Sequence, residues 1–211
     1  MTSRPLAIFD LDGTLIDSRR DLADAGNAAR AALGLPPLSL SDVQGMIGDG
    51  ASKLIERLTP GYGSAERNHA FAAFRSDYAT RLTATTRVYA GIAEALAELR
   101  ARGWQLAVAT NKPAVFAQPI LDQLGIAVDA LRGGDGPKKP DPSMLLDLMT
   151  TLGASVTQTW MIGDHHTDLA AAKNAKLRSI WCTWGFGQRN DEPATAIAHK
   201  PADMLSILSH G

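Results

Sequence analysis

Residues 6–14 read Leu6-Ala7-Ile8-Phe9-Asp10-Leu11-Asp12-Gly13-Thr14. The first four are wholly apolar, which suits a strand buried on both faces, as in a parallel sheet. The run stops at Asp10, and open α/β sheets bind their ligands outside the carboxyl ends of the strands. Asp10 and Asp12 are two residues apart, so extended backbone would direct both carboxylates to one side of the chain. This stretch therefore predicts a strand that brings two acids to a ligand-binding edge.

The same pattern, an apolar run followed by polar residues, recurs in the second half of the chain. Further strands are predicted over residues 105–110, 159–164 and 179–183, and helical spacing occurs around residues 92–99, 116–124, 144–149 and 169–175. Strands that alternate with helices of this length imply right-handed βαβ units. We predict a doubly wound, Rossmann-like α/β core with a parallel sheet. Residues 188–200 are polar and predict a loop, followed by a weak element around residues 202–208.

The alternation is interrupted between residues 17 and 87. This stretch lacks an apolar strand run and has Ala-rich helical patterns, with turn signals at residues 34–37 and 59–61. We expect a helical insertion after the first strand. The predicted division is a core of residues 1–16 and 88–211 and a helical cap of residues 17–87.

Composition narrows the class of protein. The chain has 211 residues, of which 45% are hydrophobic and 20% charged, as is ordinary for a soluble globular protein. Its net charge is −1 and its 21 basic residues are dispersed, so we expect neither a nucleic-acid nor a membrane partner. The single cysteine, Cys182, cannot form an intrachain disulfide, and no apolar run approaches the ~18 residues of a membrane span. The expected location is the cytoplasm, and the expected state is a monomer or a homodimer.

Polar residues follow three of the four predicted strands, and each has an ordinary structural explanation when taken alone. Thr110 and Asn111 could cap the helix that begins near Pro113. Asp164 could cap the helix after it, and Asp168 could be a solvated helix residue. Their joint occurrence at strand ends indicates a site instead.

Four motifs in this order resemble the haloacid-dehalogenase superfamily, in particular its phosphoglycolate-phosphatase-like branch. The first is Asp10 to Thr14, the second is Thr110, the third is Lys139 before Pro140-Asp141-Pro142, and the fourth is Gly163-Asp164 with Asp168. Lys138 beside Lys139 leaves two registers for the third motif, and the Lys-Pro-x-Pro pattern favours Lys139. The insertion falls where that family places its cap, and Ile47-Gly48-Asp49-Gly50 is similar to its cap loop.

The resemblance implies magnesium-dependent hydrolysis of a small phosphomonoester. Asp10 would be the nucleophile that forms an aspartyl phosphate, and Asp12 the general acid and then base. Asp10, the Asp12 carbonyl and Asp164 would hold Mg²⁺, which prefers oxygen ligands. Asp168 would order a metal-bound water or Lys139.

The substrate side of the site follows from the same resemblance. Thr110, the amides near Asn111 and the positive charge of Lys139 would bind the phosphate. The loop of Gly48, Asp49 and Gly50 would close over the substrate. Phosphoglycolate is the first candidate, ahead of other small sugar or acid phosphates, nucleotides and pyrophosphate. A phosphomutase, a pyrophosphatase and a non-enzymatic phosphate-binding module stay open as alternatives, whereas a dehalogenase would not need Asp12.

His165-His166 departs from the family pattern, in which a serine commonly follows Gly-Asp. Two histidines beside an acidic site raise the alternative of zinc. Neighbouring side chains in a turn are expected to point apart, and neither histidine has a histidine four residues away. We therefore expect no ligand role for them, while His165 could tune contacts with the metal or the substrate.

Overall fold

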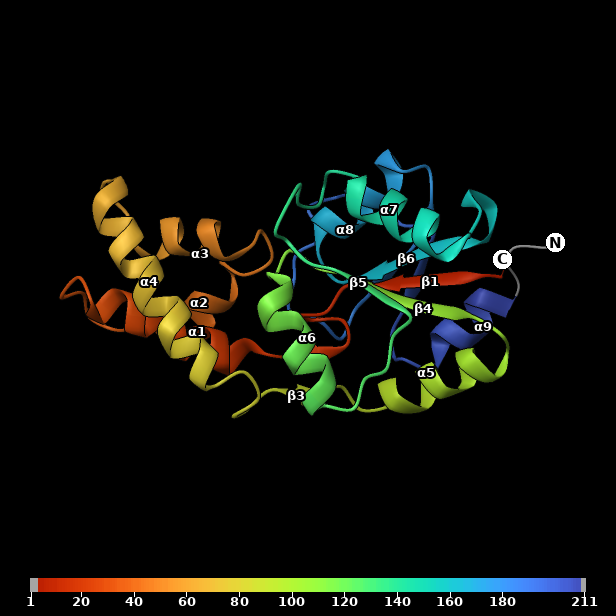
Figure 1. Ribbon diagram of the computed structural model, residues 1–211, viewed down its shortest axis with the longest axis horizontal. Helices are drawn as coiled ribbons and strands as arrows, with labels where there is room; N and C mark the ends of the chain where they lie inside the picture. Colours follow the sequence, from red (N-terminus) through yellow and green to blue (C-terminus); the bar gives the residue numbers. More distant parts are fainter. Residues whose placement is uncertain (1–3, 210–211) are drawn as a thin grey trace.

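The computed structural model describes residues 4–209. Within this range the chain forms one parallel six-stranded sheet with helices on both faces, and a group of helices that lies beyond one end of the sheet (Figure 1). The strand order is β5-β4-β1-β6-β7-β8. The strands are β1 (Leu6–Phe9), β4 (Gln105–Ala109), β5 (Ala130–Arg132), β6 (Thr159–Gly163), β7 (Arg178–Cys182) and β8 (Ala196–Ala198). The predicted doubly wound α/β core is confirmed.

Successive residues of β1 face opposite layers of helices. Leu6 and Ile8 belong to a core with α7 (Ser143–Leu152) and α8 (His166–Asn174). Ala7 and Phe9 belong to the larger core, which contains side chains of α5 (Ile92–Ala101), α6 (Ala114–Gln123) and α9 (Asp203–Ser209). Both faces of the strand are thus covered, which explains why its sequence is apolar without alternation.

The register of the sheet brings the polar strand ends together. Phe9 is opposite Val108 of β4 on one side and Ile162 of β6 on the other. The Asp10 amide continues the ladder by donating to the Ile162 carbonyl at 2.9 Å. The residues that follow β1, β4 and β6 therefore share one edge, at the point where the strand order reverses.

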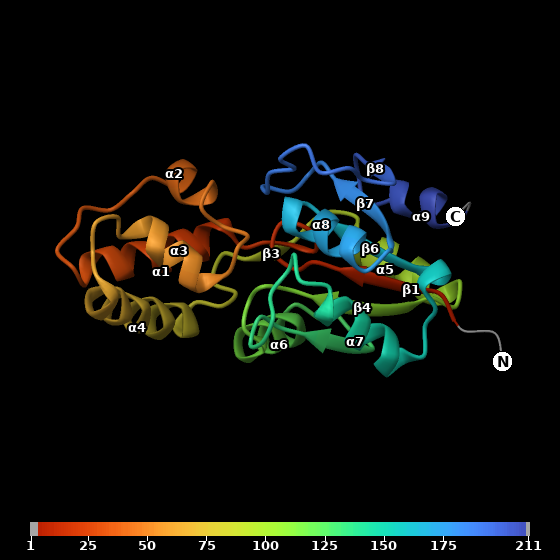
Figure 2. The ribbon, with the colours of Figure 1, turned by 90° about the horizontal axis from the view of Figure 1, so that it is seen from above.

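The helical insertion lies beyond that edge (Figure 2). It contains α1 (Arg19–Ala31), α2 (Leu40–Gln44), α3 (Ala51–Leu58) and α4 (Ser64–Thr80), and α1 packs along α4. The chain enters through β2 (Ile16–Asp17) and returns through β3 (Arg87–Val88), and these two short strands pair antiparallel. The two crossings between sheet and insertion are thus held side by side.

Two features differ from the sequence-based expectation. The loop predicted over residues 188–200 contains β8, which pairs with β7 at the sheet edge. β5 pairs with β4 at the opposite edge, and the sequence had not indicated it. Both are three residues long, too short for a periodic signal, and are defined by backbone pairing with a longer neighbour. The weak element around residues 202–208 is α9, and a short 3₁₀ helix, η1 (Val156–Gln158), precedes β6.

The described helices give no indication of a membrane span. Across residues 4–209, none combines the length and the apolar character that crossing a bilayer requires.

Candidate active site

A buried lysine connects two of the predicted acids. Lys139 Nζ donates to Asp10 Oδ1 at 2.8 Å, to Asp168 Oδ1 at 2.6 Å and to the Ala109 carbonyl at 2.6 Å. These three bonds use all the donors of an ammonium group. Burial disfavours the charge of Lys139, but the two carboxylates outweigh this effect and raise its pKa. Lys139 is therefore a fixed cation beside Asp10.

Three carboxylates converge at the same edge of the sheet. Asp10, Asp164 and Asp168 each offer an oxygen, and these oxygens lie within 4.8 Å of one another. Asp164 is held by the Thr14 hydroxyl at 2.9 Å and by the amide of Gly187 at 2.8 Å. The Phe186 amide also donates to Asp164, at 3.0 Å.

The charge balance of this cluster fits a magnesium ion. Burial raises the pKa of Asp10 to about 6, against the opposing charge of Lys139. Burial, together with the charges of Asp10 and Asp168, raises the pKa of Asp164 well above its usual range. Three buried carboxylates share one ammonium, so the site has unbalanced negative charge. An all-oxygen donor set with surplus negative charge suits a hard divalent cation such as Mg²⁺.

The second acid of the first motif has a different partner. Asp12 Oδ1 accepts from Lys112 Nζ at 2.5 Å and from the Ser18 hydroxyl. Lys112 Nζ also donates to the Tyr78 hydroxyl of α4 at 2.7 Å. Burial opposes the charge of Lys112, but Asp12 and Tyr78 raise its pKa. The side chains of Asp10 and Asp12 are thus held by two separate lysines.

Sequence reasoning did not select Lys112, Ser18 or Tyr78. Lys112 lies two residues after Thr110, the spacing that separates Asp10 from Asp12, so the second motif carried a signal for it. Tyr78 lies in a helix of the insertion, and nothing in the sequence connects it to residues more than thirty positions away.

The polar residues after β4 lie at the same edge. The Thr110 hydroxyl is buried and accepts from the Lys112 amide at 3.2 Å. Asn111 Oδ1 accepts from the Lys139 amide at 2.8 Å, and Asn111 Nδ2 donates to the carbonyls of Lys139 and Gly48, each at 3.1 Å. The Asn111 side chain therefore holds the Lys139 loop and the insertion loop in place.

A cavity open to solvent lies between this edge and the insertion. Asp10, Asp12, Thr110 and Lys112 line its polar end. The remaining lining is mostly apolar and comes from both units: Leu22, Ile47, Leu54, Phe74, Pro113 and Phe116. A small ligand can thus present a polar group to the two acids while its remainder contacts apolar side chains.

The loop between α2 and α3 closes one side of this cavity. Gly48 and Gly50 line it and have φ angles of 126° and 89°, which favour glycine. A Cβ atom at Gly48 would lie 2.4 Å from His165 Nε2, so the backbone approaches the core closely. Asp49 does not line the cavity. Its carboxylate lines a neighbouring polar recess and pairs with Arg57 at 2.5 Å.

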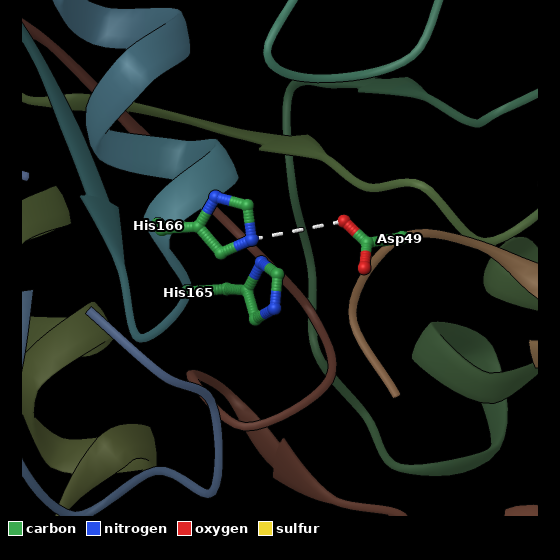
Figure 3. A group of neighbouring side chains, drawn as sticks. All are labelled: Asp49, His165 and His166. Carbon is green, nitrogen blue, oxygen red and sulfur yellow. Dashed lines mark ion pairs between the residues drawn. The ribbon is translucent and has the colours of Figure 1, made fainter. Parts of the chain in front are cut away.

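The two adjacent histidines lie together and not apart. The ring centroids of His165 and His166 are 4.2 Å apart, and both rings lie beside Asp49 (Figure 3). The expectation that they point apart is wrong because the backbone changes from extended at His165 to helical at His166, which begins α8. Burial, with the neighbouring His166, lowers the pKa of His165 to about 4.

The sheet is doubly wound, a carboxylate bound to a lysine follows its first strand, and a helical insertion faces this edge. Together these features define an α/β enzyme with a potential carboxylate nucleophile. The family model of haloacid dehalogenase-like hydrolases matches residues 5–176, and the chain belongs to this family.

Several proteins resemble the chain over most of its length. A phosphoglycolate phosphatase of Pseudomonas putida is 39% identical over 213 residues, which cover 96% of this chain and 78% of that protein. A phosphoglycolate phosphatase of Agrobacterium fabrum is 37% identical over 197 residues, covering 88% and 84%. The crystal structure of a predicted phosphoglycolate phosphatase from Haemophilus somnus is 32% identical with a TM-score of 0.90, and covers 98% of this chain and 99% of that one.

Proposed function

We propose that this chain, a phosphatase of the haloacid dehalogenase-like hydrolase family, hydrolyses a small phosphomonoester with Mg²⁺ through an aspartyl phosphate on Asp10. The observation that carries the proposal is the separation of the two acids of the first motif. Asp10 is bound to Lys139 at 2.8 Å, while Asp12 is bound to Lys112 at 2.5 Å. Two carboxylates with separate partners are suited to separate chemical roles.

In the first step an ionised oxygen of Asp10 attacks phosphorus as the bond from phosphorus to the leaving oxygen breaks. Three hydrogen bonds hold Lys139 in place, and its charge offsets that of the phosphoryl oxygens. Asp10, Asp164 and the Asp12 carbonyl would hold Mg²⁺, which when bound neutralises phosphate charge and orients the phosphate. Asp168 positions Lys139.

Asp12 serves both half-reactions. It gives a proton to the leaving oxygen in the first and takes a proton from water in the second, in which water displaces Asp10 from phosphorus. Lys112 and Ser18 fix the orientation of its carboxylate. The Thr110 hydroxyl and the amides near Asn111 would donate to phosphate oxygens.

Phosphoglycolate is the first candidate substrate, because the relatives from Pseudomonas putida and Agrobacterium fabrum are named phosphoglycolate phosphatases. Lys112 lines the cavity and is the cation nearest to Asp12, so it could also meet a second acidic group of the substrate. We further propose that residues 17–87 act as a cap, with the loop of Gly48 and Gly50 over the bound substrate.

The experiment is a hydrolysis assay on a panel of small phosphates, phosphoglycolate included, with Mg²⁺ and with phosphoenzyme trapping. Wild-type protein should release phosphate from at least one compound and form an acid-stable adduct on Asp10. Asp10→Asn should form none, whereas Asp122→Asn, an exposed carboxylate on α6, should match the wild type. Release of phosphate by Asp10→Asn at the wild-type rate would refute the proposal.

A further inference from the structure

We propose that Asp49, His165 and His166 form a second metal site, for a divalent transition ion such as Zn²⁺ or Co²⁺. One ligand atom of each residue lies within 4.8 Å of the other two (Figure 3). Two imidazoles and one carboxylate are a donor set that zinc uses in proteins, with a fourth position left for water. The set differs in kind from the all-oxygen cluster of Asp10, Asp164 and Asp168.

The ring and the backbone of His165 are each already held by a hydrogen bond. Its Nδ1 lies 2.9 Å from the Thr167 hydroxyl, and its backbone amide donates to Asp168 Oδ2 at 2.9 Å. The other ring nitrogen, Nε2, faces the insertion loop that carries Asp49, since a Cβ atom added to Gly48 would lie 2.4 Å from it. Histidines that bind metals are commonly fixed by such a partner, because it sets the ring orientation before the ion arrives.

Asp49 is held in a similar way. Arg57 donates to its Oδ2 at 2.5 Å and to the Met46 carbonyl at 2.7 Å, and Oδ1 remains directed at His166. The guanidinium offsets part of the carboxylate charge, so we expect the site to bind an ion more weakly than a closed structural zinc site.

The spacing between Asp49 and His166 suits an ion better than a direct bond. His166 Nε2 lies 3.8 Å from Asp49 Oδ1, which is too long for a hydrogen bond. Ligands of a tetrahedral ion with bonds of about 2 Å are separated by about 3.3 Å, so small side-chain movements would complete the site. The side chains of Asp49 and His166 are 22% and 29% exposed, which permits such movement and leaves access for the ion. Gln44, Gln188 and Asn190 line the same recess and could bind a metal-bound water.

The site would join two parts of the molecule. Asp49 belongs to the loop between α2 and α3 of the insertion, whereas the histidines begin α8 of the core. Binding of an ion should therefore hold this loop against the core at the edge of the cavity.

Calorimetric titration of the magnesium-saturated protein with ZnCl₂, and with CoCl₂ followed by visible absorption, tests the proposal. Saturating Mg²⁺ limits binding at the carboxylate cluster, and Asp164→Asn titrated in parallel identifies any ion that still binds there, because its signal is lost in that variant. We expect one ion per chain, a cobalt spectrum typical of four-coordinate nitrogen-containing sites, and slower hydrogen exchange of amides in residues 45–50. His166→Ala and Asp49→Asn should each weaken binding at least about tenfold.

His199→Ala, an exposed histidine beside β8, is the matched control and should bind like the wild type. Should His166→Ala fail to fold, as judged by its melting temperature, His166→Gln takes its place. Absence of binding to the wild type, equal binding by the variants, or displacement of the ion by added Mg²⁺ would each overturn the proposal.

Discussion

The Asp21 carboxylate and Thr86 join the two ends of the insertion. Asp21 Oδ2 accepts from the Thr86 amide at 2.8 Å and from the Thr86 hydroxyl at 2.7 Å, and both residues are buried. Thr85 adds bonds from its amide and hydroxyl to the same carboxylate. Asp21 lies in the first turn of α1, just after the chain enters the insertion, and Thr86 lies just before β3, where it returns. One side chain thus fixes the geometry of both crossings.

Asp21→Asn should therefore destabilise the protein strongly for a single isosteric change. The amide nitrogen would face the backbone and hydroxyl donors of Thr85 and Thr86, leaving buried groups unsatisfied at a cost of about 2–3 kcal/mol. Asp24→Asn is the matched control, because Asp24 lies on the same helix and its ion pairs within residues 4–209, with Arg20 and Arg81, are long, at 3.5 and 3.7 Å. Urea denaturation should show that the control lowers the free energy of unfolding by less than about 1 kcal/mol. Equal losses in the two variants would contradict this role of Asp21.

The same carboxylate should contribute to acid sensitivity. Burial raises the pKa of Asp21, but the bonds from Thr86 and Thr85 outweigh burial, and the net shift is downward. A lowered folded-state pKa stabilises the protein at pH values above the ordinary Asp pKa of about 4, and this contribution is lost as the pH falls through the folded value. The free energy of unfolding of the wild type should consequently fall more steeply below about pH 4 than that of Asp21→Asn. Parallel profiles for the two proteins would exclude this contribution.

The sequence predicts those parts of the fold and site that depend on local pattern. The apolar run before Asp10 sufficed for the buried strand, and strand ends in a parallel sheet meet at one edge whatever the remaining sequence is. The pairs Lys112–Tyr78 and Asp21–Thr86 could not be predicted, because they join residues 34 and 65 positions apart. The first pair depends on how the insertion packs against the core, and the second on how the two ends of the insertion meet. The orientation of His165 and His166 depended on a change of backbone conformation within one residue, which periodicity does not report.

Lys112→Met should impair catalysis by more than its effect on stability explains, and the melting temperature reports that effect separately. A methionine fills the same space but leaves Asp12 and the Tyr78 hydroxyl without this donor. Asp12 would lose the ammonium that orients it, and we expect kcat to fall about tenfold to a hundredfold, a part of the roughly hundredfold to ten-thousandfold that a general acid or base contributes. Lys138→Met is the control, because Lys138 is half-buried beside Gly50 and contacts neither acid. Steady-state kinetics with phosphoglycolate and with p-nitrophenyl phosphate would separate two roles for Lys112. A rise in KM confined to phosphoglycolate indicates contact with its carboxylate, and an unchanged kcat with both substrates rules out the orienting role.

Removal of Mg²⁺ should abolish turnover, and calcium should inhibit it. The proposed ligands, which are Asp10, Asp164 and the Asp12 carbonyl, supply only oxygen, which either ion accepts. Calcium takes more ligands in a more flexible geometry and could bind both oxygens of Asp10, leaving no free oxygen to attack phosphorus. The measurement is hydrolysis after EDTA treatment and dialysis, followed by addition of each ion separately. Undiminished turnover by the stripped protein, or full activity with calcium, would contradict the proposed metal requirement.

Gly48→Ala should reduce catalysis through loss of the close approach between the insertion loop and the core. The new Cβ atom would lie 2.4 Å from His165 Nε2, so the loop must move away from the cavity that it lines.

Gly34→Ala is a matched control, because Gly34 also lies in the insertion with a positive φ of 70° but has nothing within 4 Å of the added Cβ. An alanine at Gly34 carries the strain of the left-handed region, about 1 kcal/mol. An alanine at Gly48 is strained more, because a φ of 126° lies outside that region, and it adds the steric clash. We expect kcat/KM for a small natural substrate to fall about tenfold or more in Gly48→Ala, and much less for p-nitrophenyl phosphate, which gains little from closure of the loop. Gly34→Ala should change neither value. Equal losses on both substrates in Gly48→Ala would indicate general damage to the site, and no loss on either would show that the loop is only a connection between α2 and α3.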